Sequence, residues 1–151
     1  MINEQLLKNE LKDLIGYSSN SKDKTILVLS GGGLRGFSLL GALTILHEYG
    51  YLSNINTYAG TSIGSITCLL LSIGYTPQNI YEILYNKNFD DLININMNGL
   101  LTKLGLDSGS NILEYFYIFL NNKNIDPNIT FIDLYKLTNK KVVFTATCIN
   151  N

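Results

Sequence analysis

Ser62 is the residue whose surroundings most clearly indicate chemistry. It is central in Gly60-Thr61-Ser62-Ile63-Gly64, which follows Tyr58-Ala59 and precedes a helical apolar stretch. Gly-x-Ser-x-Gly at a strand-to-helix junction is typical of a nucleophile elbow, in which small residues let the backbone turn tightly and expose the serine oxygen. The pattern predicts Ser62 as a catalytic nucleophile, with Gly60 and Gly64 shaping the turn.

A second glycine-rich turn lies earlier in the chain, directly after the apolar residues 25–29. Its sequence is Ser30-Gly31-Gly32-Gly33-Leu34-Arg35-Gly36. A serine that attacks an ester carbonyl needs hydrogen-bond donors for the oxygen on which negative charge collects, and losing one donor costs about 3 to 4 kcal/mol. The backbone N–H groups of Gly32, Gly33 and Leu34 are candidate donors. That of Ile63 is a further candidate.

The same glycine loop also fits a dinucleotide-binding pattern. Gly31, Gly33 and Gly36 match Gly-x-Gly-x-x-Gly, which expects an acidic residue about 20 positions later to bind a ribose. Residues 53–56 offer no acidic side chain, and the chain contains no Gly-Lys-Ser/Thr phosphate loop. Nucleotide binding is therefore disfavoured.

A general base for Ser62 is harder to find. The single histidine, His47, precedes the serine, whereas the usual α/β hydrolase triad has its histidine after the serine. A Ser-His-Asp triad is therefore excluded within this chain. The simplest alternative is a carboxylate that acts directly as the general base.

The elements that must position the two turns form a strand, helix, strand unit. Residues 25–29 suit a buried strand, residues 37–49 carry apolar side chains at helical spacing, and residues 56–59 form a short second strand. Gly50 is placed to end the helix in a left-handed conformation. Such units are right-handed crossovers with parallel strands, so both turns should lie at the carboxyl edge of one sheet.

The rest of the chain divides into residues 1–24, an amphipathic helix at 3–15 with a polar linker, and one α/β domain at 25–151. After the Ser62 turn we expect a buried helix that ends before Gly74, and then a helix from Pro77 to about residue 86 that Thr76 caps. An irregular stretch follows at 87–109, with a short helix at 100–104. The last elements expected are a helix capped by Ser110, a short helix capped by Thr130 with Asp133, and a strand at 141–149.

The composition is that of one globular domain: 151 residues, 46% hydrophobic and 15% charged. A net charge of −1 without a basic block excludes nucleic acid as a partner class. Cys68, Cys148 and His47 have no metal-ligand spacing, so no metal or other cofactor is expected. No secretory signal is recognised, and the apolar stretch 63–75 is shorter than a membrane span of about 20 residues. An intracellular protein, cytoplasmic or peripheral to a membrane, is predicted.

Three stretches together resemble the patatin-like phospholipase family. They are Ser-Gly-Gly-Gly-Leu-Arg-Gly, Gly-Ala-Leu-Thr-Ile-Leu-His-Glu-Tyr-Gly and Ala-Gly-Thr-Ser-Ile-Gly-Ser-Ile, and the resemblance extends over about residues 25 to 149. It implies a three-layer α/β/α fold with a mostly parallel central sheet and a lipid acyl hydrolase with a Ser-Asp dyad. Gly31 to Gly36 would be the oxyanion loop and Ser62 the nucleophile. Arg35 would hold the loop or meet a lipid phosphate.

The chain departs from the family at the dyad aspartate, which the family places in Asp-Gly-Gly or Asp-Gly-Ala. Neither sequence occurs here. A following glycine is absent at each aspartate that comes after Ser62, namely Asp90, Asp91, Asp107, Asp126 and Asp133. We interpret the chain as the N-terminal portion of a truncated patatin-like domain, with an incomplete sheet whose third strand exposes an unpaired edge.

Two functions follow from the resemblance. The first is hydrolysis of phospholipids or other acyl lipids through Ser62, with the base supplied from beyond residue 151 and with peripheral membrane contact left open. The second is a catalytically dead module that binds lipid or a protein partner, as the missing aspartate suggests. The oligomeric state is not predicted.

Overall fold

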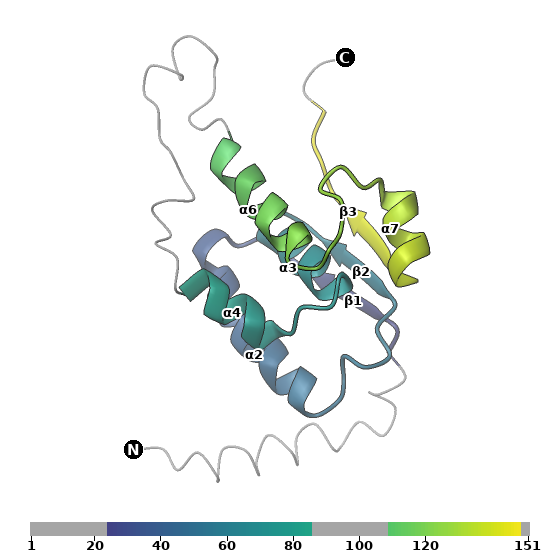
Figure 1. The fold of residues 1–151 in the computed structure, drawn as a ribbon. Helices are drawn as coiled ribbons and strands as arrows, with labels where there is room; N and C mark the ends of the chain where they lie inside the picture. Colours follow the sequence, from purple (N-terminus) through teal and green to yellow (C-terminus); the bar gives the residue numbers. More distant parts are fainter. Residues whose placement is uncertain (1–23, 86–108, 149–151) are drawn as a thin grey trace.

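The structure, a computed structural model, describes residues 24–85 and 109–148 (Figure 1). The helix expected at 3–15, most of its linker, the helix expected at 100–104 and the last residue of the strand expected at 141–149 lie outside the described residues. The described residues include the whole strand, helix, strand unit and both glycine-rich turns.

Three strands form one parallel sheet. In spatial order they are β1 (Ile26–Leu29), β2 (Thr57–Gly60) and β3 (Lys141–Phe144). The predicted α/β class and the predicted parallel pairing of the first two strands are confirmed.

The carboxyl ends of the strands form one edge of the sheet. In the register, Gly60 at the end of β2 lies between Leu29 of β1 and Phe144 of β3. The strand predicted at 141–149 is shorter than expected and ends at Phe144. β3 stops there because its pairing partner β2 ends at Gly60 and offers few further hydrogen-bonding groups.

Helix α2 (Gly36–Glu48) connects β1 to β2 after a short 3-10 turn, η2 (Gly33–Arg35). As predicted, Gly50 closes the turn after this helix in a left-handed conformation, with φ +77°. The N–H of Tyr51 reaches back to the carbonyl of Leu46 at 2.9 Å, as in a Schellman motif. This C-terminal turn needs a positive φ, which glycine adopts without strain.

Helix α3 (Ile63–Ser72) follows β2 and packs directly against the sheet. It ends in a second Schellman motif at Gly74, with φ +89°. Two lysines reach backbone carbonyls at the C-terminal end of this helix and in the turn that follows it. Lys123 Nζ donates to the Gly74 carbonyl at 2.9 Å, and Lys140 Nζ donates to the Leu71 carbonyl at 3.5 Å. Their positive charges stabilise the negative end of the helix dipole.

Two predicted threonine caps are confirmed. Thr76 begins α4 (Pro77–Tyr85) and Thr130 begins α7 (Phe131–Thr138). Each hydroxyl accepts a hydrogen bond from the backbone N–H three residues later, at 3.1 Å for Thr76 and 3.2 Å for Thr130. Each therefore satisfies one of the free N–H groups at its helix start.

The cap predicted at Ser110 is wrong. Helix α6 (Ser110–Asn121) has Gly109 at the N-cap position, with φ +73°, and Ser110 is its first helical residue. The chain enters this helix through a left-handed conformation, which a glycine adopts more easily than a serine.

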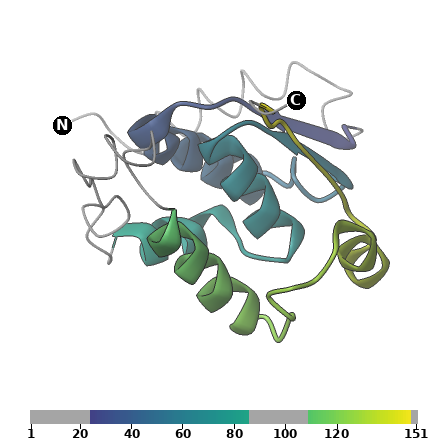
Figure 2. The same cartoon turned by 90° about the horizontal axis from the view of Figure 1, so that it is seen from above.

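Helices α2, α3, α4 and α6 lie on one side of the sheet, whereas α7 lies beside β3 (Figure 2). The core between these elements is apolar. Its buried hydrophobic residues are Leu29, Leu40, Leu43, Ile55, Tyr58, Cys68, Leu70, Leu71, Ile73, Tyr75, Ile80, Phe119, Leu120, Ile125 and Leu134. At its α6 side, the rings of Tyr75 and Phe119 meet edge to face at 5.5 Å.

The described part of the chain leaves the opposite face of the sheet open. Ile26, Val28 and Val143 occupy that face, with 59%, 72% and 43% of their surfaces exposed. The outer edge of β3 pairs with no strand within residues 24–85 and 109–148, and an unpaired edge is a surface on which another strand can add. The exposed face of the sheet and the unpaired edge of β3 are two surfaces on which further protein could pack.

Cys68 lies at the centre of the contact between α3 and the sheet. Its thiol is fully buried and donates a hydrogen bond to the Ala59 carbonyl of β2 at 3.3 Å. Burial raises the pKa of Cys68 from 9.0 to about 11, and burial likewise raises the pKa of the neighbouring Tyr58. Both groups therefore stay neutral in the folded protein above the pH at which they ionise in the unfolded chain.

We predict that stability falls as the pH rises from about 9 to about 11. A group with a raised folded-state pKa favours the unfolded state once the unfolded chain ionises, at about 1.4 kcal/mol per pH unit across that window. Urea unfolding at several pH values measures this loss. Cys68→Ala should flatten the pH dependence, and an unchanged slope in this variant would show that the thiol does not ionise on unfolding.

Candidate active site

Ser62 lies on the sharp turn between β2 and α3, at the carboxyl edge of the sheet. Its φ of +53° and ψ of −126° are typical of the second residue of a type II′ turn. The N–H of Gly64 closes this turn on the carbonyl of Thr61 at 3.0 Å. Residues other than glycine rarely adopt such a conformation, which costs roughly 1 to 3 kcal/mol. The side chain of Ser62 is exposed, so a strained turn presents a hydroxyl to solvent.

The two glycines around Ser62 have no room for a side chain. A Cβ atom on Gly60 would lie 2.5 Å from the carbonyl carbon of Gly64. A Cβ atom on Gly64 would lie 2.5 Å from the carbonyl oxygen of Leu29, at the end of β1. The first turn of α3 therefore touches the backbone of two strands, and this close approach needs glycine at both positions.

The glycine loop lies against the Ser62 turn, as predicted. A Cβ atom on Gly31 would lie 3.3 Å from the Cβ of Ser62, and one on Gly36 would lie 2.6 Å from Cγ1 of Ile63. The structure thus brings together two segments that are some thirty residues apart in the sequence, as expected for two turns at one sheet edge.

Several backbone N–H groups of the two turns have no acceptor in the described part of the chain. Among the described residues, no acceptor is found for the N–H groups of Gly32, Gly33 and Ile63. Leu34 is the middle residue of η2, which the N–H of Arg35 closes on the Gly32 carbonyl at 3.1 Å. Because α3 begins at Ile63, the positive end of its dipole is at the same place.

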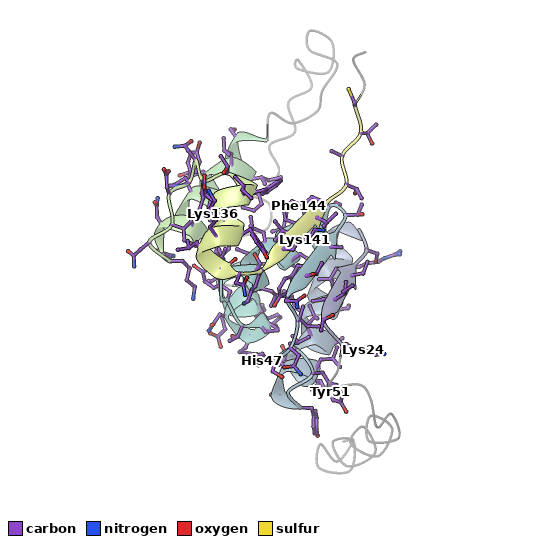
Figure 3. The ribbon with its side chains drawn as sticks, turned by 90° about the vertical axis from the view of Figure 1, so that its right-hand side faces the viewer. Lys24, His47, Tyr51, Lys136, Lys141 and Phe144 are labelled. Atoms are coloured by element: carbon purple, nitrogen blue, oxygen red, sulfur yellow. The ribbon has the colours of Figure 1, made fainter. Side chains whose placement is uncertain are left out.

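The basic side chains of Arg35 and His47 lie at opposite ends of α2. Arg35 is exposed at the end of η2 and forms no ion pair with a described carboxylate. His47 lies in the last turn of α2, about 16 Å along the helix from Gly36 at 1.5 Å per residue. Figure 3 shows His47 well apart from Phe144, which ends β3. His47 therefore does not contribute to the Ser62 site.

No general base for Ser62 is found among the described residues. The Ser62 hydroxyl has no hydrogen-bond partner there. Asp126 accepts the N–H of Asn128 at 2.9 Å. Asp133 accepts hydrogen bonds from Lys136 and Thr130, and these two partners lower its pKa. Asp126 therefore stabilises a local turn, and Asp133 stabilises the first turn of α7.

The remaining aspartates named in the sequence, Asp90, Asp91 and Asp107, lie outside the described residues. Within residues 24–85 and 109–148, no three His, Cys, Asp or Glu side chains cluster closely enough to hold a metal ion. None of the helices described there is long and apolar enough to cross a membrane.

A groove of about 630 Å³ lies between α7 and the sheet, away from Ser62. It is lined by Asn56, Thr57, Phe131, Ile132, Tyr135, Asn139, Lys141 and Val142. Thr57 and Lys141 begin β2 and β3, so the groove opens at the amino edge of the sheet. It therefore does not form the pocket for a substrate of Ser62.

One contact at the site was missed by the sequence analysis. Thr145, directly after β3, donates a hydrogen bond from Oγ1 to Oγ1 of Thr61 at 2.9 Å. Its N–H also donates to the carbonyl of Gly60 at 3.2 Å. A polar residue that follows a third parallel strand reaches the same sheet edge as Ser62, but the strand predicted at 141–149 placed Thr145 inside the strand.

Comparisons with known proteins agree with the geometry. The family model described as "Patatin-like phospholipase" matches residues 27–151. A probable lipid hydrolase of Invertebrate iridescent virus 6, 463L, is 39% identical over 137 residues, which are 86% of this chain and 46% of the relative. An uncharacterised protein of Acanthamoeba polyphaga mimivirus, R571, is 33% identical over 114 residues, 73% of this chain and 38% of the relative.

A more distant relative is the triacylglycerol lipase SDP1L of Arabidopsis thaliana, 27% identical over 152 residues, 97% of this chain and 18% of the relative. The chain thus spans less than half the length of each of these relatives. No solved structure matches the chain.

We predict opposite effects for two glycine-to-alanine changes. Gly64→Ala should lower the free energy of unfolding by about 1 to 3 kcal/mol or more, because its Cβ would meet the Leu29 carbonyl. Gly41→Ala, in the interior of α2 with nothing within 4 Å of its Cβ, should raise it by up to about 1 kcal/mol. Urea denaturation measures both, and equal stability of the two variants would contradict the packing described here.

Proposed function

The chain belongs to the patatin-like phospholipase family, and on this premise we propose that the protein hydrolyses acyl ester bonds of lipids with Ser62 as its nucleophile. The proposed substrate is a phospholipid or another acyl lipid, reached by peripheral contact with a membrane. The names of two relatives, a probable lipid hydrolase and a triacylglycerol lipase, support the substrate class.

The proposed reaction has two steps. The Ser62 hydroxyl transfers its proton to a base as Oγ bonds to the carbonyl carbon of the ester, which places negative charge on the carbonyl oxygen. The tetrahedral intermediate then expels the alcohol, which takes up a proton, and leaves an acyl-Ser62 ester. Water, activated by the same base, hydrolyses this ester to a fatty acid and restores the serine.

The observation that carries the proposal is the meeting of an exposed, strained Ser62 with the glycine loop. In this arrangement the N–H groups of Gly32, Gly33 and Ile63 are the proposed donors to the oxyanion, with Leu34 as a further donor. Gly31 supports this geometry, because its missing side chain leaves the loop close to Ser62. Arg35 is proposed to hold the loop or to meet a phosphate of the substrate.

The base is proposed to be a carboxylate supplied by a part of the protein outside residues 24–85 and 109–148. A carboxylate fits because His47 is remote, and because Asp126 and Asp133 are engaged in local turns. A direct Ser-carboxylate pair needs the acid within hydrogen-bond reach of the serine, about 2.6 to 3.2 Å between heavy atoms.

The absence of a carboxylate at Ser62 among the described residues favours a second function, a catalytically inactive module that binds lipid or a protein partner. Its test uses the 151-residue chain with vesicles and with an activated ester. Binding without ester turnover or labelling of Ser62 would support the inactive module. Turnover that depends on Ser62 would exclude it.

We predict that Ser62→Ala abolishes fatty acid release by the protein that carries the complete family domain. Removing the nucleophile removes the covalent route, and serine nucleophiles in such sites contribute factors of about a millionfold. Fatty acid release from radiolabelled phospholipid is the measurement. Ser53→Ala, which changes an exposed serine bonded to the Gly50 carbonyl, is the control and should retain activity. Unchanged hydrolysis in Ser62→Ala would refute the proposal.

We predict that Gly31→Ala slows the reaction at Ser62 more than it destabilises the fold. Its Cβ would lie 3.3 Å from the Cβ of Ser62, a tight contact at which the loop must shift by a few tenths of an ångström. A small displacement of the oxyanion donors should lower the rate by about tenfold or more. Labelling of Ser62 by a fluorophosphonate, compared with the melting temperature, separates the two effects.

A further inference from the structure

Thr61 is the residue through which the Ser62 turn is attached to all three strands. Its N–H donates to the carbonyl of Leu29 at 3.2 Å, which links it to β1. It follows Gly60 directly, at the end of β2. Its Oγ1 accepts the hydrogen bond from Thr145, the residue directly after β3. Its carbonyl, finally, accepts the N–H of Gly64 and so closes the turn that contains Ser62.

The bond between Thr61 and Thr145 differs from the other attachments because it is made by side chains. The other attachments use backbone groups, which any residue could supply. The Oγ1 atoms of the two threonines are 2.9 Å apart, although the residues are separated by 84 positions in the sequence. Both side chains are exposed at the carboxyl edge, so this bond is formed in competition with water and is not forced by core packing.

The strained conformation of Ser62 explains why the hydrogen bond between Thr61 and Thr145 matters for the site. A residue with φ +53° and ψ −126° relaxes unless its neighbours fix the backbone on both sides. On the C-terminal side α3 does so. On the N-terminal side, Thr61 is fixed by the Leu29 carbonyl and by Thr145. Because Cγ2 of Thr61 would lie 3.7 Å from a Cβ on Gly31, its side-chain orientation also bears on the glycine loop.

We propose that Thr145 is a positioning residue for the Ser62 site. Its hydroxyl fixes Thr61, and through Thr61 it holds the Ser62 turn and the adjacent glycine loop in their relative positions. Thr145 acts on the turn and not on the substrate. The inference rests on the proposed function only where it concerns the reactivity of Ser62. The effect on the turn itself is independent of catalysis.

The test compares four single variants of the 151-residue chain, together with the double variant Thr61→Val/Thr145→Val. Thr145→Val and Thr61→Val each remove a hydroxyl while keeping a β-branched side chain, and Thr145→Ser keeps the hydroxyl. Thr57→Val is the matched control, because Thr57 makes a similar hydroxyl bond, to Oδ1 of Asn56 at 3.0 Å, at the opposite end of β2.

The first measurement is hydrogen exchange at the amide of Gly64, which closes the turn. Thr145→Val and Thr61→Val should each speed this exchange by about fivefold, as expected for losing one hydrogen bond, and the double variant should show no further increase. Thr145→Ser and Thr57→Val should exchange like the unchanged chain. Unchanged exchange in Thr145→Val overturns the inference, whether or not Ser62 is reactive.

The second measurement is the labelling of Ser62 by a fluorophosphonate, made with the same variants of the protein that carries the complete family domain, because the proposed base lies outside the described residues. Thr145→Val should lower the maximal labelling rate by about fivefold and leave the half-saturating probe concentration unchanged, because only the geometry of the serine is altered. Faster exchange with an unchanged labelling rate would overturn the role in reactivity. Faster exchange in Thr145→Val, with Ser62 unreactive even in the unsubstituted protein that carries the complete family domain, would support the positioning of the turn and contradict the proposed function.

Discussion

The close contact between the first turn of α3 and the ends of β1 and β2 is the constraint on which the site depends. At Gly64 the backbone of the helix meets the backbone of β1 with no space for even a methyl group, and Gly60 allows the same approach to β2. A helix that begins so near the sheet leaves only a tight turn for the chain between them. Ser62 occupies that turn and is forced into a conformation that most serines avoid.

Helix α3 connects this turn to the rest of the molecule. Its first N–H groups lie at the candidate site, its middle is buried against the sheet through Cys68, and carbonyls at its C-terminal end and in the turn that follows receive Lys123 and Lys140. Positive charge at that end complements the helix dipole. The helix is therefore fixed at both ends and along one face, and the position of Ser62 follows from the packing of the core.

Much of this could be predicted from the sequence, because local signals and sheet topology agreed. Gly50 and Thr130 are in the roles that their residue types favour, and two turns that follow parallel strands had to meet at one edge. The start of α6 was harder to predict, because both Gly109 and Ser110 are residue types that occupy N-cap positions. The direction from which the chain enters the helix decides between them. The end of β3 depends on where β2 stops, and the bond from Thr145 depends on that register, which composition does not encode.

The glycines at 60 and 64 also affect how a motif of this kind should be interpreted in a genome. Each is required by backbone contacts that exist whether or not a serine stands between them. A descendant of this protein could replace Ser62 by another residue and would still need glycine at positions 60 and 64, since the helix could not otherwise approach the strands. The two glycines would therefore remain after enzymatic activity is lost. Their presence in a lineage records selection for folding as much as selection for catalysis.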